Sequence, residues 1–241
     1  MRVSIVVPAF NEEKLLAQSL AAIRAASAAF ARRGWDVELI VCDNNSTDRT
    51  AAIAREAGAM VVFEPLNQIS RARNAGAAHA HGDWLVFIDA DSWPTRELFD
   101  DAAQAMASRD CLAGGVTLRY DTTRLDIRIP LAIWNAVSRL AKWAAGSFMF
   151  CEAAAFREVG GFSEALYAAE EVDFFRRLKK LARARRRRIV ILHRHPLLSS
   201  DRKARLYGWS EIGLVLVRML ATRGRSLRSR DGCQPWYDGR R

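Results

Sequence analysis

The sequence predicts an α/β protein whose single domain is a mostly parallel, doubly wound sheet with helices on both faces. Short apolar runs alternate with segments of helical periodicity through the first half of the chain, which is typical of parallel sheets with right-handed crossovers. Polar clusters follow the apolar runs directly, where open parallel sheets bind ligands. At 241 residues the chain can form one sizeable core and does not require two.

The expected strands and helices follow one another in a regular order. Apolar runs bounded by turn residues predict strands at residues 4–7, 37–41, 60–63, 84–88, 112–118 and 189–192, with 147–155 extended. Apolar residues three and four apart predict helices from Asn11 to Gly34 and at residues 47–57, 71–80, 95–107, 125–143, 170–181 and 206–220. Pro8 is expected to stop the first strand. Asn11 should then cap the first helix, with Glu12 and Glu13 in its first turn.

Charge and cysteine content limit the class of protein. Lys and Arg number 37 against 27 Asp and Glu, a formal net charge of +10, and basic residues concentrate at 176–188. This run indicates a solvated helix end or a surface attracted to anionic lipid. A nucleic-acid partner is not expected, because no aromatic residues interleave with the run. Four separated cysteines, no signal-peptide pattern and no apolar run of about 20 residues predict a cytoplasmic protein, free or bound to the inner face of a membrane.

Three polar turns follow strands whose carboxyl ends should meet in one crevice. They are residues 8–13, residues 43–48 and Asp89-Ala90-Asp91. The chain contains neither a GxGxxG nor a GxxxxGK[ST] loop, so phosphate would need another partner. Two carboxylates at a strand end can hold Mg²⁺ or Mn²⁺, and such an ion can bridge phosphate oxygens. The sequence therefore predicts a metal and phosphate site at Asp89 and Asp91.

Longer segments occur in an order known from one enzyme family. They are Ser4-Ile5-Val6-Val7-Pro8-Ala9-Phe10-Asn11-Glu12-Glu13, Asp43-Asn44-Asn45-Ser46-Thr47-Asp48, Arg71-Ala72-Arg73-Asn74-Ala75-Gly76, Asp89-Ala90-Asp91, Gly160-Gly161-Phe162 and Glu170-Glu171-Val172-Asp173. In these segments the chain resembles the inverting glycosyltransferases of family 2, which have the GT-A fold, from Ser4 to about Tyr207. The resemblance implies a GT-A domain at 1–222, with a nucleotide-sugar half at 1–120, an acceptor half at 121–222, and a basic, mobile tail at 223–241.

For the donor, the resemblance implies contacts at the strand ends. The nucleoside would lie against Pro8, Ala9, Asn11 and Glu12, and Asp43 would accept a hydrogen bond from the base ring. The structural alternative for Asp43 is a turn former. Asn44 stands where many relatives have a further aspartate, which removes one charge and keeps the capacity to hydrogen bond.

For the diphosphate and metal, the resemblance implies cations and acids from distant segments. Asp89, Ala90 and Asp91 form the metal motif, with Asp91 as the direct ligand, and His193 resembles a position that adds a third metal contact in some relatives. Arg73 would reach a phosphate or pair with an acid. Arg202 and Lys203 would clamp the diphosphate, or else lie in a solvated turn.

The base that accepts the acceptor's proton is expected at the start of the helix at 170–181. The family has an Asp in a Glu-Asp pair there, whereas this chain reads Glu170-Glu171, so Glu171 takes the position of the base. Asp173 and Glu170 are the alternatives. A purely structural explanation is that these acids are stabilised at the N-terminus of the helix by its dipole.

Taken together, these features predict an inverting, metal-dependent transfer of a sugar from a nucleotide diphosphate donor, most simply a UDP-sugar, to an acceptor hydroxyl. The QxxRW motif of processive synthases is absent from the sequence, which favours single transfers to a carbohydrate or lipid-linked acceptor. Residues 125–150 and those after Ser199 should form the acceptor side, where Trp134, Trp143, Phe148 and Trp209 stack on a sugar, meet a lipid chain or belong to the core. The alternatives are a catalytically silent nucleotide-sugar-binding scaffold and a sugar nucleotidyltransferase, although the latter needs a GxGxR-type loop that the first turn lacks.

Overall fold

The computed structural model describes residues 1–202, 222, 225–230 and 233. Within this range one eight-stranded sheet has the strand order β3-β2-β1-β4-β7-β6-β8-β5. The helix predicted at 206–220, Lys203, Trp209 and most of the tail at 223–241 lie outside the described residues. No helix within the described range is both long enough and apolar enough to cross a bilayer.

The strands and helices follow the predicted alternation. The strands are β1 (Arg2–Ala9), β2 (Asp36–Asp43), β3 (Met60–Phe63), β4 (Trp84–Ile88), β5 (Ser92–Trp93), β6 (Cys111–Tyr120), β7 (Phe148–Glu152) and β8 (Arg188–Ser199). The helices are α1 (Leu16–Ala31), α2 (Thr50–Glu56), α3 (Ile69–Ala78), α4 (Arg96–Ala107), α5 (Leu125–Ala141), α6 (Ala153–Glu158) and α7 (Glu170–Ala184), with a 3₁₀ turn, η1, at Arg225–Arg228. The sequence did not predict β5 or α6, and β8 is longer than expected.

The sheet is parallel in its first half and mixed in its second. β1 pairs in parallel with β2 and β4, β2 with β3, and β6 with β8. β7 lies between β4 and β6 and is antiparallel to both, and β5 is antiparallel to β8. The doubly wound α/β prediction is confirmed, and β7 is where strict parallel order ends.

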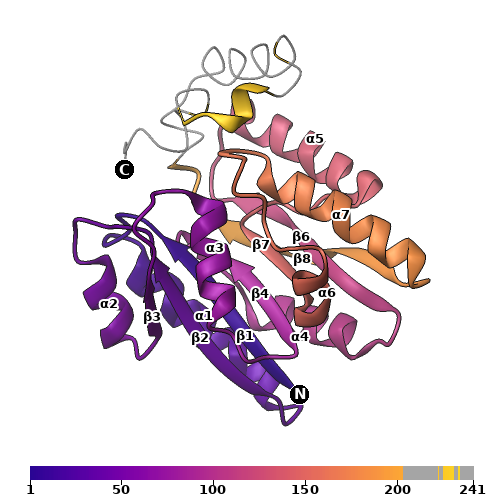
Figure 1. Cartoon of the computed structure of the whole chain (residues 1–241), viewed down its shortest axis with the longest axis horizontal. Helices are drawn as coiled ribbons and strands as arrows, with labels where there is room; N and C mark the ends of the chain where they lie inside the picture. The colour runs from indigo at the N-terminus through magenta and orange to yellow at the C-terminus, as the bar shows by residue number, and fades with distance from the viewer. Residues whose placement is uncertain (203–221, 223–224, 231–232, 234–241) are drawn as a thin grey trace.

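The two faces of the sheet bury alternate residues of the same strand. Val3, Ile5 and Val7 of β1 belong to a core that also contains apolar residues of α1 and α4. Val6 points the other way, into a core formed with β4, α6 and α7. Figure 1 shows α3, α6 and α7 on one side of the sheet and α1 and α4 on the other.

The start of the first helix differs from the prediction. α1 begins at Leu16, its N-cap is Leu15, and no side chain caps it. Asn11 is not the cap, because it lies in the left-handed region with φ of 51° and the chain turns there before the helix starts. Pro8 does not stop the strand either, since β1 continues to Ala9. Residues 10–15 therefore form a separate turn at the sheet edge.

Candidate functional site

The three polar turns meet at one edge of the sheet, as their order in the sequence predicts. Ala9 at the end of β1 pairs with Asp43 at the end of β2, and Asn44 donates its backbone N–H to the Ala9 carbonyl at 2.8 Å. β4 runs parallel to β1 on its other side, and Asp89 follows its last residue. The edge formed by these strand ends is the candidate site.

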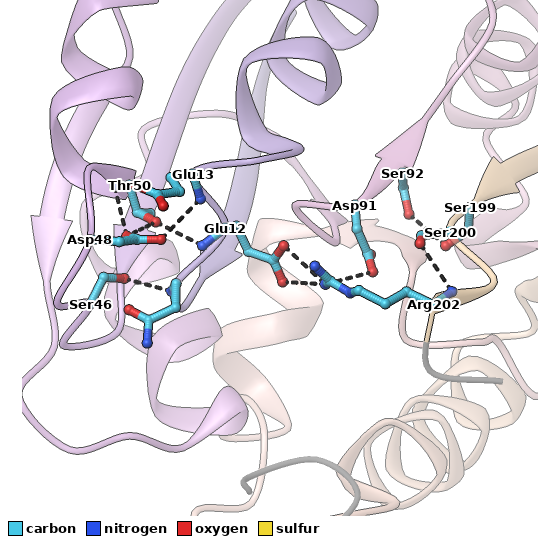
Figure 2. Close-up of polar contacts among 11 residues, drawn as sticks. Glu12, Glu13, Ser46, Asp48, Thr50, Asp91, Ser92, Ser199, Ser200 and Arg202 are labelled. Carbon is cyan, nitrogen blue, oxygen red and sulfur yellow. Dashed lines mark hydrogen bonds and ion pairs between the residues drawn. The ribbon is translucent and has the colours of Figure 1, made fainter. Parts of the chain in front are cut away.

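The turn after β1 is fastened to the turn after β2 (Figure 2). Asn11 accepts a hydrogen bond from the Thr47 backbone N–H at 2.8 Å, and its own N–H donates to Ser46 Oγ at 3.0 Å. The Glu12 N–H donates to Thr50 Oγ1 at 2.8 Å. Asn11 thus joins two loops, and its side-chain oxygen already accepts a hydrogen bond from the second loop.

Asp43 and Asn44 order the turn after β2. Asp43 is 7% exposed, and its Oδ1 accepts the Ser46 N–H at 3.0 Å, so its expected role as a turn former is present. Asn44 Nδ2 donates to the carbonyls of Glu64 and Leu66 at 3.2 and 2.6 Å. Its Oδ1 accepts the backbone N–H of residue 68 at 2.9 Å. An aspartate could not donate to two carbonyls, so this departure from the family pattern has a structural use.

Arg73 of α3 links the end of β4 to the start of α7. Its side chain is 1% exposed, and Nη1 donates to Glu170 Oε1 at 2.6 Å. Nη2 donates to Asp89 Oδ1 at 3.1 Å and to the Gly146 carbonyl at 3.1 Å. The guanidinium also lies 5.3 Å from the centre of the Phe162 ring. Burial acts to lower the pKa of Arg73, but the charges of the neighbouring acids outweigh this effect and raise the pKa overall. Arg73 therefore stays protonated.

The three acids at the start of α7 have different surroundings. Glu170 is 4% exposed and is held by Arg73, whereas Asp173 is half-buried and pairs with Arg177 one turn along the helix at 2.8 Å. Burial, together with the charge of Glu170, raises the pKa of Glu171 to about 8. The first residue before the helix is Ala169, and no side chain caps the helix. The structure therefore brings Glu170 and Glu171 to Arg73 and directs Asp173 to a different partner.

Arg202 lies between acids of two different turns (Figure 2). Its Nη2 donates to both carboxylate oxygens of Glu12, at 2.7 and 3.0 Å, and lies 3.4 Å from Asp91 Oδ2. The preceding segment is fixed to the same place, because the Ser200 N–H donates to the Asp91 carbonyl at 3.0 Å. Burial tends to lower the pKa of Arg202, yet the hydrogen bond and charge of Glu12 and the charge of Asp91 raise it overall. The segment that follows β8 is thus held against the Asp89-Ala90-Asp91 turn by Ser200 and Arg202.

His193 lies apart from these acids. It is an exposed residue in the middle of β8, and it lines a cavity with residues of α4, among them Asp101 and Gln104. The part of β8 that lies beside the aspartate turn is its end, where Ser199 pairs with Ser92. Ser199 is six residues further along the strand than His193. The structure does not bring His193 together with Asp89 and Asp91.

The acids of the site suit a hard divalent cation whose remaining coordination positions are filled by substrate phosphates. Within the described residues, no group of three or more His, Cys, Asp or Glu side chains is arranged to hold a metal. Asp89 and Asp91 supply carboxylate oxygens, and Mg²⁺ is commonly held by one or two carboxylates with substrate phosphates as further ligands. Arginine cations contact both acids, which shows that positive charge is favoured there.

Two further residues belong to the site without having been predicted. Gly146 accepts a hydrogen bond from Arg73, and a Cβ built on it would lie 2.9 Å from Arg73 Nη2. Nothing in the sequence around Gly146 indicated this. Tyr120 ends β6, and burial together with the charges of Asp91 and Asp89 raises its pKa. Its position at a strand end was the signal that could have identified it.

Residues 4–162 match the family model described as Glycosyl transferase family 2. Among curated relatives, the undecaprenyl-phosphate 4-deoxy-4-formamido-L-arabinose transferase of Enterobacter sp. (strain 638) is 35% identical over 97 residues, which are 37% of this chain and 29% of that protein. The matched segments are short parts of the curated relatives, and the chain spans 21% of one of these proteins and 36% of another.

Two solved structures share the fold. A mannosyltransferase from Pyrobaculum calidifontis, in complex with GDP-Man and Mn²⁺, superposes with a TM-score of 0.69 at 19% identity, over 93% of this chain and 62% of that one. S. aureus TarS 1-349, in complex with UDP-GlcNAc, gives a TM-score of 0.65 at 20% identity, over 84% of this chain and 59% of that one. At these identities the likeness shows the fold, and it confirms the GT-A prediction.

Proposed function

The chain belongs to glycosyltransferase family 2, and we propose that it transfers a sugar from a nucleotide diphosphate donor to an acceptor hydroxyl with inversion at the anomeric carbon. The observation that carries the proposal is the connection through Arg73, which contacts Asp89 at the end of β4 and Glu170 at the start of α7. This connection supports the proposal that the aspartate turn and the start of α7, where Glu171 lies, belong to one site. Each part alone would be compatible with many α/β proteins.

For the donor, we propose that the diphosphate binds at Asp89, Ala90 and Asp91 with Mn²⁺ or Mg²⁺. Asp91 would be the direct ligand, and the ion would neutralise the charge of the departing diphosphate. The base of the nucleoside would lie near Asp43 and the turn at Pro8 to Glu12. A UDP-sugar is the first choice; of the similar structures, TarS is in complex with UDP-GlcNAc and the mannosyltransferase with GDP-Man.

For the acceptor, we propose Glu171 as the general base. Glu170 accepts a hydrogen bond from Arg73 and Asp173 from Arg177, so both of these carboxylates have ion-pair partners. A pKa of Glu171 raised to about 8 makes its carboxylate form a stronger base than an ordinary glutamate, and the share of that form grows as the pH approaches 8. A lipid-linked acceptor is favoured over a free sugar, because one relative is named as an undecaprenyl-phosphate transferase. We further propose single transfers at the inner face of the membrane.

The donor site can be tested by the melting temperature of the full chain with UDP, GDP and dTDP, each with and without Mn²⁺. At a ligand concentration of 100 Kd, binding adds about 2.7 kcal/mol of stability, which is a rise of roughly 5–11 °C for a chain of this size. We expect one nucleotide to give this rise only with Mn²⁺. Asp91→Asn should abolish the metal-dependent part, and Asp36→Asn, an exposed acid at the other end of β2, should leave it unchanged.

The outcomes separate the proposal from its rivals. A metal-dependent shift followed by no hydrolysis or transfer of the matching nucleotide sugar would favour the silent scaffold. Formation of a nucleotide sugar from a nucleoside triphosphate would favour the nucleotidyltransferase. No shift with any nucleotide, in folded protein, would contradict the donor site itself. Glu171→Gln should keep the shift and lose transfer; normal transfer would move the role of the base to Asp173 or Glu170.

A further inference from the structure

Helix α5 is apolar on both of its sides. Towards the protein, Ile127 is buried and Leu131 and Trp134 pack against the main core. Its outer face carries a second apolar row, with exposures of 38–86%, formed by Leu125, Ile129, Ile133, Val137 and Leu140. Surface helices normally present charged or polar residues to water. A row of five large apolar side chains at helical spacing indicates a surface that meets an apolar partner.

Basic residues border this row, which we call the α5 outer face. Arg128 and Arg139 are exposed and lie about three helical turns apart, so they project from the same flank of the helix. Lys142 follows the helix and is also exposed. Asp126, the acid within α5 itself, is paired with Arg124 at 2.6 Å. The border of the apolar row is therefore positively charged.

Helix α7 extends the positive surface beside the end of α5. The Lys179 ammonium lies 5.3 Å from the centre of the Trp143 ring and donates to the Ala141 carbonyl at the end of α5. Arg176 and Lys180 of α7 are exposed. Figure 1 shows the two helices near each other at the same side of the molecule. The apolar row and a broad basic surface thus belong to one region of the protein.

We propose that the α5 outer face docks on the surface of an anionic lipid bilayer. The helix lies in the plane of the interface, with its apolar row at the boundary of the acyl chains and the bordering arginines and lysines at the lipid phosphates. Charge decides between this partner and a second copy of the chain. A two-fold contact would bring the basic border of one copy near that of the other, within a chain whose net charge is +10. An anionic surface complements both the charge and the apolar row, and this inference does not depend on the donor site.

The test is co-sedimentation of the full chain with mixed phosphatidylcholine and phosphatidylglycerol vesicles, with pure phosphatidylcholine vesicles as reference. We expect binding to the anionic vesicles that weakens with added salt. The double variant Ile129→Ser/Ile133→Ser should bind at least about tenfold more weakly, because the inserted apolar area is lost. Arg128→Gln and Arg139→Gln should each weaken binding roughly fivefold, which corresponds to about 1 kcal/mol per basic residue. The matched control is Met60→Ser, which removes an exposed apolar side chain of β3 and should bind as the wild type does.

Three results would overturn the proposal. The first is no sedimentation with anionic vesicles at low salt. The second is a chain that is dimeric in solution and becomes monomeric in the Ile129→Ser/Ile133→Ser variant, because the face would then meet a second copy. The third is a fall in melting temperature of that variant well beyond that of Met60→Ser, because exposed side chains contribute little to stability and a large loss would mean that the chain itself covers the face.

Discussion

Replacing Arg73 by methionine tests whether the buried cation holds the site together. The substitution keeps much of the side-chain volume and removes the positive charge that contacts Asp89 at 3.1 Å and Glu170 at 2.6 Å. Glu170 would then be a carboxylate that is 4% exposed and has lost its cation. Removing one partner of a buried ion pair costs about 3–5 kcal/mol, because the remaining charge is left without compensation.

The expected loss is large enough to measure by thermal unfolding. For domains of 150–250 residues, a change of 1 kcal/mol shifts the melting temperature by about 2–4 °C, so Arg73→Met should lower it by about 6–20 °C. Circular dichroism or intrinsic fluorescence would record the transition. The matched control is Arg32→Met, because Arg32 pairs with Asp100 at 2.7 Å and both side chains are exposed. An exposed pair contributes about 0–1 kcal/mol, so the control should change little.

The pH dependence of the variant gives a second measurement of the same effect. Arg73 acts to lower the pKa of Glu171, so without Arg73 burial and the charge of Glu170 should raise that pKa further. A carboxyl group whose pKa is raised in the folded state stabilises that state at low pH, and this stability is lost as the pH rises through the folded pKa. Arg73→Met should therefore recover part of its stability at mildly acidic pH, and adding Glu170→Gln should recover it at neutral pH. A loss no greater than that of Arg32→Met, with no pH dependence of its own, would refute the reasoning.

Three further predictions concern neighbouring residues of the site. Asn44→Asp should lower the unfolding free energy by about 1–3 kcal/mol in urea titration, because two backbone carbonyls lose their donor; an unchanged midpoint would contradict the observed network. Gly146→Ala should cost about 1–3 kcal/mol, because its Cβ would lie 2.9 Å from a guanidinium that two acids hold in place; a neutral effect in the same titration would show that Arg73 moves freely. Because burial and Glu170 raise the pKa of Glu171 to about 8, wild-type stability should fall as the pH rises from about 5 to 8 more steeply than that of Glu171→Gln; parallel melting curves would argue against the raised pKa. If Glu171 is the base, transfer by the wild type should also increase towards pH 8.

The alternation of apolar runs was sufficient to predict the sheet and the edge at which the site lies. β3 and β4 have the bounds that their apolar runs predicted, and the turns after β1, β2 and β4 meet as parallel strand ends should. Strand ends are predictable because burial of a strand is a local property of its side chains. Several of the segments that resemble the family lie at the same turns. The apolar pattern and the family resemblance therefore indicated the same site.

Pairings between distant segments could not be predicted in this way. Asn11 was expected to cap a helix, but its side chain accepts from Thr47 in another loop, thirty-six positions away in the numbering. A local rule for helix caps cannot detect a partner from a different turn. Gly146 was missed for the same reason, because what it contributes is a backbone carbonyl whose partner, Arg73, lies on α3. The antiparallel direction of β7 likewise depends on packing between strands rather than on the apolar run itself.

The two aspartates of the proposed metal motif, Asp89 and Asp91, differ in how readily each can exchange the arginine that it contacts. Asp89 is paired with Arg73, whose side chain is 1% exposed and is also held by Glu170, so exchanging that cation would leave a buried charge behind. Asp91 lies 3.4 Å from Arg202, whose side chain is 16% exposed and remains paired with Glu12 at 2.7 Å when it leaves Asp91. An incoming divalent cation therefore displaces less at Asp91 than at Asp89. This difference supports the proposal that Asp91 is the direct ligand, and it gives Asp89 a second use as the acid that anchors Arg73.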